Sequence, residues 1–101
     1  MRLNEATSRV FDLLMRDKDL GQMLDQVCAQ ERSVVVLADE LLGMLAEWGW
    51  NDIMRRAIPR WDEVPLYWHE IIIDCIDLEA IVTLRIHDLR GYESTLQDPV
   101  Y

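Results

Sequence analysis

The sequence predicts an all-α protein, a small bundle of four to five helices that forms a single domain over residues 1–101. Three observations support this class. Apolar residues recur three and four positions apart in three long segments, which is the spacing of one face of an α-helix. Residues that cap helix ends flank several of these segments. Half of the residues are hydrophobic, which is ample for one core at this length.

The first two predicted helices lie before residue 30. Asn4 and Glu5 form a helix start, and the apolar stripe that follows runs to about Arg16. A polar break at residues 17–19 separates it from a second stripe. That stripe consists of Leu20, Met23, Leu24, Val27 and Cys28.

The third segment carries the clearest helical pattern, and either Ser33 caps it or the second helix continues straight into it. Its stripe consists of Val34, Leu37, Leu41, Met44, Leu45 and Trp48. The run of valines at its start suits a strand, but the helical period continues for four turns and outweighs that propensity. Gly49 marks the end of this helix. A short fourth helix follows Asn51 or Asp52 and ends before Pro59.

Residues 66–89 decide the fold class. Read as one long buried helix, they place one apolar stripe on a single face, and Gly91 supplies the C-terminal cap. The stripe consists of Ile71, Cys75, Leu78, Val82, Ile86 and Leu89. The alternative is an α+β protein with C-terminal strands in residues 71–89, because every second residue of the run 78–86 is apolar, namely Leu78, Ala80, Val82, Leu84 and Ile86. No turn sequence folds this run into a hairpin, so we favour the helix.

The balance of charge limits the classes of partner. The net charge is −9, from 19 acids and 10 bases. Binding to nucleic acid or to an anionic membrane depends on Lys and Arg, so we expect neither. The acidity favours a protein partner with a basic surface, or it serves solubility alone. The N-terminal residues lack the pattern of a signal peptide, and no apolar run approaches the roughly 20 residues that span a bilayer, so we expect a cytoplasmic protein.

The residue types that carry catalysis do not form a recognisable constellation. There is no phosphate-binding glycine loop and no nucleophile motif, so we expect no enzyme and no cofactor. Cys28 and Cys75 match no zinc or redox spacing and are expected to be small buried residues. His69 lies near three acids, but the Glu-x-x-His pair of helical metal sites is absent, so we expect no metal.

Two neighbouring features mark a candidate surface. All four tryptophans fall between residues 48 and 68, and from Trp61 to Leu84 there are six acids and no Lys or Arg. Glu70, Asp74 and Asp77 are spaced i, i+4 and i+7, which places them on one face of a continuous helix. The predicted partner-binding residues are Trp61, Asp62, Glu63, Tyr67, Trp68, Glu70, Asp74 and Asp77. The alternatives are an aromatic core cluster and an ordinary solvated helix face.

In size, charge and helicity the chain resembles the small acidic helical inhibitors of phages, such as anti-CRISPR and anti-restriction proteins, and the bacterial immunity proteins that neutralise basic nucleases. No motif carries this resemblance, so it assigns no residue roles. It implies a non-catalytic inhibitor that occludes a basic, nucleic-acid-handling partner. The alternative is a secretion chaperone or a small structural subunit of a larger assembly. The generous apolar content also predicts a homodimer.

Overall fold

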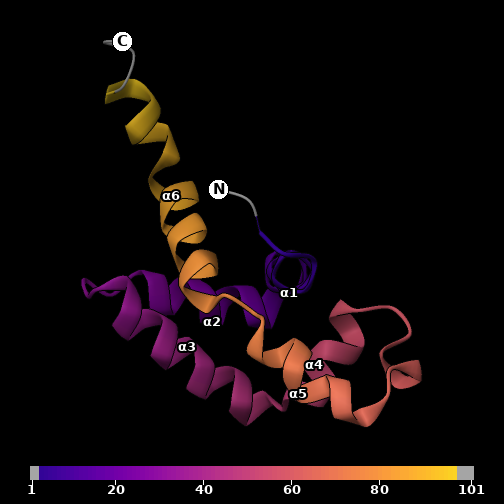
Figure 1. Cartoon of the computed structure of the whole chain (residues 1–101). Helices are drawn as coiled ribbons and strands as arrows, with labels where there is room; N and C mark the ends of the chain where they lie inside the picture. Colours follow the sequence, from indigo (N-terminus) through magenta and orange to yellow (C-terminus); the bar gives the residue numbers. More distant parts are fainter. Residues whose placement is uncertain (1–2, 98–101) are drawn as a thin grey trace.

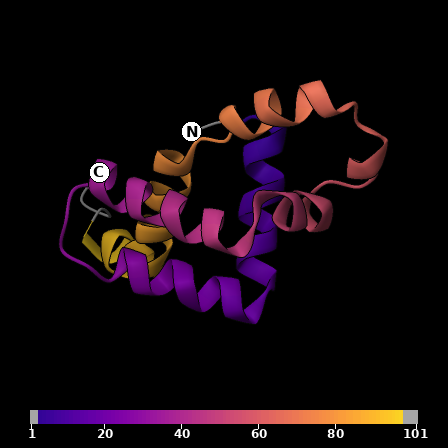
Figure 2. The same cartoon turned by 90° about the horizontal axis from the view of Figure 1, so that it is seen from below.

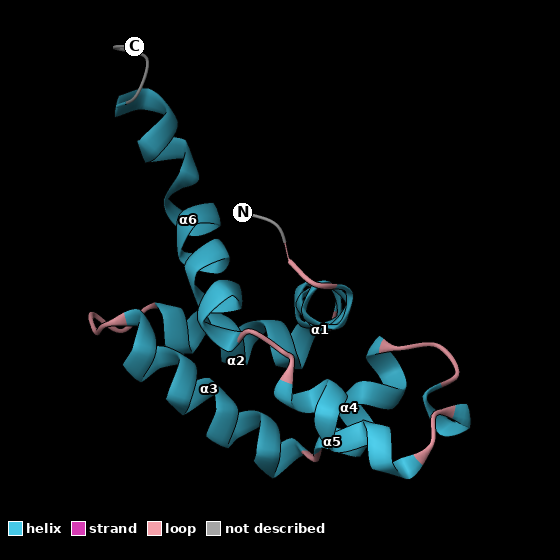
Figure 3. Ribbon diagram, viewed as in Figure 1, coloured by secondary structure: helices cyan, strands magenta, loops and turns pink. Residues whose placement is uncertain are grey.

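The computed structural model describes the backbone of residues 3–97 and the side chains of residues 3–89. Within these ranges the chain forms six α-helices and one short 3-10 helix, without any strand. The elements are α1 (Glu5–Arg16), α2 (Lys18–Cys28), α3 (Val34–Trp48), α4 (Trp50–Ala57), η1 (Trp61–Glu63), α5 (Leu66–Asp74) and α6 (Leu78–Gln97). Figure 3 shows these helices joined by short loops.

The predicted all-α class is therefore confirmed, and the alternative with strands in residues 71–89 is wrong for the described chain. The expected number of four to five helices is too low. The segment 66–89 forms two helices, α5 and α6, in place of one. Gly91 does not end the last helix either, since α6 continues to Gln97.

Polar side chains cap three of the helix starts, and the cap at Ser33 shows that α3 is a helix separate from α2. The side chains of Asn4, Asp17 and Ser33 accept hydrogen bonds from the backbone N–H of Thr7 (2.8 Å), Leu20 (2.9 Å) and Val36 (3.4 Å). Each bond satisfies one of the N–H groups that a helix start leaves without a partner. Gly49 separates α3 from α4 at a φ of 100°, a conformation that only glycine adopts without strain.

One cluster of buried apolar side chains forms the core, and every helix except α5 supplies fully buried members of it. Helix α6 packs on α2 and α3, and α1 packs on α2 and α4. Figure 2 shows that the axis of α1 is steeply inclined to those of α2 and α3. The predicted stripes provide the centre of the cluster, for example Leu24, Leu41 and Leu45, which are fully buried.

An ion pair joins α2 to α6. The guanidinium of Arg85 donates two hydrogen bonds to the carboxylate of Asp25, at 2.7 and 3.2 Å, and these bonds raise the pKa of Arg85. Beyond this contact, α6 leads away from the other helices (Figure 1). The molecule is elongated as a result, with extents of 50 × 25 × 23 Å.

The two cysteines lie in different environments, and both are free thiols. Cys28 is buried as expected, and burial, followed by the nearby charge of Asp25, raises the pKa of its thiol. Cys75 is exposed. Its predicted burial is wrong because it follows the last residue of α5 and does not lie within a continuous helix.

Candidate functional site

Helix α5 contacts the core only through partly buried side chains, among them Ile72 and Ile73. It has no buried residue. Positions 66, 70 and 74 share one row of the helix, and positions 67 and 71 lie beside them. Leu66 is 82% exposed, Tyr67 71% and Ile71 50%, and Glu70 and Asp74 are exposed among them. We call these five residues the α5 face.

The inner side of α5 rests on Trp61. The indole of Trp61 is only 2% exposed, and it stacks on the ring of His69 with centroids 3.9 Å apart and planes at 22°. The Nε2 of His69 lies 3.0 Å from the carbonyl oxygen of Val64, so that nitrogen donates the hydrogen bond. Trp61 therefore positions α5 from beneath. Among the predicted partner-binding residues, it is the one whose side chain lies in the core.

The acids before α5 already have partners within the chain. Asp62 accepts a hydrogen bond from Arg55 at 3.1 Å, and Glu63 lies 3.8 Å from Arg60. All four side chains are exposed, so each pair contributes at most about 1 kcal/mol. Their charges nevertheless offset one another, which leaves Glu70 and Asp74 as the acids of the α5 face without a salt bridge in the described chain.

Asp77 has a different role from the one its spacing predicts. Its carboxylate accepts a hydrogen bond from the N–H of Ala80 at 3.0 Å and caps the start of α6. The expected continuous face of Glu70, Asp74 and Asp77 is therefore wrong, because the helix is interrupted between Asp74 and Leu78. Glu70 and Asp74 remain one turn apart on α5.

The start of α1 holds this interruption in place. The buried hydroxyl of Thr7 accepts a hydrogen bond from the N–H of Asp77 at 2.9 Å and contacts the carbonyl oxygen of Cys75 at 3.4 Å. The side chain of Asn4 donates to the same carbonyl oxygen at 2.8 Å. Backbone groups that a continuous helix would pair are thus satisfied by α1.

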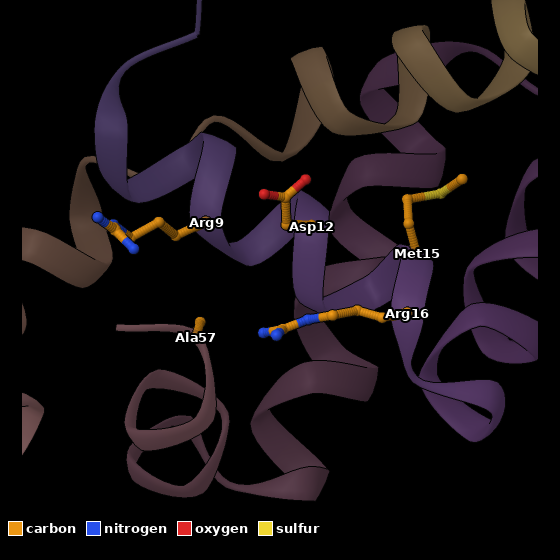
Figure 4. A pocket seen from close by; sticks show the side chains of 5 residues that line it. All are labelled: Arg9, Asp12, Met15, Arg16 and Ala57. Atoms are coloured by element: carbon orange, nitrogen blue, oxygen red, sulfur yellow. The ribbon is translucent and has the colours of Figure 1, made fainter. Parts of the chain in front are cut away.

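A shallow groove between α1 and α4 was not predicted. A cavity of about 380 Å³ is lined by Arg9, Asp12, Met15, Arg16 and Ala57. Figure 4 shows the side chains of Arg9 and Arg16 extending from α1 toward the side on which Ala57 lies. The repeat of arginine at i and i+7 is the one sequence signal for it.

The charges around this groove are largely matched. Arg9 pairs with Glu5 at 3.2 Å, Arg56 pairs with Asp17, and Arg16 donates to the carbonyl oxygen of Arg56 at 3.5 Å. The pKa of Asp17 is lowered, first by the hydrogen bond from the N–H of Leu20 and then by Arg56. Such a network ties α1 to α4 and offers no concentrated charge of either sign.

Neither a metal centre nor a membrane span is evident in the part of the chain that the structure describes. No group of three or more His, Cys, Asp or Glu side chains there is placed to hold a metal ion. No helix there has the length and apolar character needed to cross a bilayer. The chain matches no protein-family model, no curated protein and no solved structure.

Proposed function

We propose that this protein is a non-catalytic inhibitor that acts in the cytoplasm by covering a basic, nucleic-acid-handling surface of a partner protein. The observation that carries the proposal is the α5 face, on which exposed apolar side chains surround two acids that form no salt bridge with the side chains of residues 3–89. Surfaces of this composition supply both the apolar anchor and the charge that protein interfaces use.

The apolar residues of the α5 face would supply most of the affinity. Burial of a side chain such as leucine, isoleucine or tyrosine contributes roughly 2 kcal/mol. In the isolated chain, the exposed parts of Leu66, Tyr67 and Ile71 do not contribute this stabilisation. A partner that fits them therefore recovers a free energy that folding leaves unused.

Glu70 and Asp74 would set the rate of encounter. Complementary charges steer association, and salt weakens this steering because the Debye length is about 8 Å at physiological ionic strength. A basic groove that normally holds a nucleic-acid backbone matches the sign of these acids. Binding there would exclude the nucleic acid by occupying its site.

The test measures the binding of purified variants of the chain to the partner, which is isolated by its affinity for the wild-type protein. The variants reverse the charge at two different places on the chain. Glu70→Lys with Asp74→Lys should slow association at least ten-fold at low salt, and less at high salt. The control is Asp12→Lys with Glu31→Lys, which makes the same charge change at exposed positions outside α5. Surface plasmon resonance measures both rates. An oligonucleotide bound by the partner should compete with the wild-type chain.

Equal on-rates for the two double variants would show that charge serves solubility only. If Leu66→Ser and Ile71→Ser still abolished binding, the α5 face would be an apolar docking surface of another kind. A second candidate function, a secretion chaperone or a small structural subunit, is favoured by the exposed Val35 and Leu42 on α3. That function predicts association that high salt does not weaken.

A further inference from the structure

Helix α5 depends less on the core than the other helices do. Each of the others places fully buried side chains in the core, whereas α5 packs on it through partly buried ones, Ile72 and Ile73. In Figure 2, α5 lies at the edge of the molecule. The free energy needed to open an element locally falls as its buried apolar contacts become fewer. Detaching α5 removes none of its own side chains from a fully buried position.

The packing beneath α5 is incomplete. A hollow of about 260 Å³ lies between α1, the end of α4 and α5, and Ala6, Ile58 and Ile72 are among the residues that line it. Apolar side chains that border a hollow bury less area than they would against one another, so they contribute less to holding α5 in place. The indole Nε1 of Trp61 is also buried without an acceptor in the part of the chain that the structure describes. Opening would relieve the cost of that unpaired donor.

Both ends of α5 allow the helix to part from its neighbours. It follows Pro65, and no side chain within residues 3–89 caps its N-terminus. At its other end, residues 75–77 separate it from α6, whose start is capped by Asp77 and held by Thr7 of α1. Helix α6 therefore keeps its cap and its contact with α1 when α5 detaches. A helix of nine residues is not stable alone in water, so α5 would unfold as it left the core.

An aromatic contact holds the middle of α5 against the core. The ring of His69 stacks on the indole of Trp61, which is 2% exposed. The same ring donates a hydrogen bond to the carbonyl oxygen of Val64, just before the helix. A stacked aromatic pair shifts an equilibrium by roughly two- to ten-fold beyond the effect of burial. This stack exists only while α5 lies on the core, so it favours the closed arrangement.

We propose that α5 is a hinged segment that detaches and unfolds as a unit while the other helices stay folded, with the stack of His69 on Trp61 as its latch. The hinges are Pro65 and residues 75–77. In the open state Trp61 is uncovered, and the α5 face no longer exists, because its residues share one side only in a helix. The latch therefore sets the fraction of molecules that present the α5 face. That consequence for a partner rests on the proposed function, whereas the opening itself does not.

Native-state hydrogen exchange of the full chain tests whether α5 opens on its own. The amides of residues 70–74 should be at least about 100-fold less protected than those of Leu24 and Leu41 in the core. Val27→Ala weakens the body of the fold, because Val27 is fully buried in α2. It should speed exchange in the core by about ten-fold or more and leave residues 70–74 within about two-fold of the wild type. Exchange at residues 70–74 that quickens by the same factor as the core would show that α5 opens only by global unfolding, and would overturn the proposal.

His69→Ala tests the latch by the same measurement. The variant removes the stack, so residues 70–74 should exchange about five-fold faster or more, although alanine favours helix more than histidine does. Tyr67→Ala is the matched control, because it removes an aromatic ring from the exposed side of the same helix. It should change these rates by less than about two-fold. Equal effects of the two variants would reject His69 as the latch. No partner takes part in these measurements, so their failure is distinct from a failure of the proposed function.

Discussion

Asp17 serves two elements at once. Its carboxylate caps α2 by accepting a hydrogen bond from Leu20, and it pairs with Arg56 of α4. Both interactions favour the ionised carboxylate and lower its pKa. A single side chain thereby caps the N-terminus of α2 and links it to α4.

The lowered pKa of Asp17 predicts a pH-dependent stability. A group whose pKa is lower in the folded state stabilises the fold above its ordinary pKa, and this contribution is lost as the pH falls through the folded value. The wild type should therefore be more stable than Asp17→Asn at pH 7, and the difference should shrink below about pH 4. Urea unfolding at pH 7, 4 and 3 measures it. Asparagine still caps a helix, so the substitution removes the charge and keeps the cap. A difference that stayed constant with pH would show that ionisation of Asp17 does not contribute to stability.

At the scale of elements, the junction between α5 and α6 determines how the α5 face is presented. The interruption at residues 75–77 turns α6 into the core and leaves α5 on the surface. Thr7 is the buried residue that pairs the freed backbone groups of Cys75 and Asp77. Contacts from α1 thus stabilise the end of α5, a helix that begins about 60 residues later in the sequence.

Thr7→Val should destabilise the protein by about 1–3 kcal/mol. The substitution preserves the shape of the side chain but removes the hydroxyl, which leaves the N–H of Asp77 without its partner. Ser8→Ala, at an exposed position of the same helix, should change the stability by less than about 0.5 kcal/mol. Chemical denaturation of both variants checks this. Equal effects would mean that the junction does not depend on the hydroxyl of Thr7.

At the scale of the whole molecule, the chain has more surface than a compact protein of its mass. It exposes 6949 Å², whereas a compact monomer of 11.9 kDa exposes about 6,000 Å². The excess is comparable to the roughly 800 Å² that each partner buries in a standard interface. The elongated shape, with extents of 50 × 25 × 23 Å, increases the surface for a given mass.

This excess surface is the physical basis on which we predict a homodimer. Asp39 and Glu47 are exposed on α3, and pairing of two α3 helices would bring these like charges together, so the contact should lie elsewhere. Light scattering coupled to size exclusion should give twice the chain mass of 11.9 kDa at high micromolar concentration. A monomer mass at that concentration would reject self-association and leave the exposed surfaces to other proteins.

The sequence alone determined the helical class and the inner faces of the first three helices. Their apolar residues recur at the helical period and their starts carry Asn4, Asp17 and Ser33, so each signal lies within a few residues of the structure it specifies. Local interactions of this kind can be inferred before any fold is known. The exposure of Glu70 and Asp74 was also accessible in this way, because both lie on the polar stripe of the predicted helix, whereas the sequence left open whether the aromatic residues lie in the core.

Only the tertiary structure decided which of those candidate residues share a surface. The partner that stabilises the break before Asp77 is Thr7, 70 positions away in the sequence, and no local pattern reports such a contact. The core covers Trp61 because His69 of α5 stacks on it, whereas Trp68, seven positions later, is 45% exposed. Helical period specifies which residues lie on the same side of one helix. Which side is covered, and where a helix must end, depends on elements distant in the sequence that pack against it.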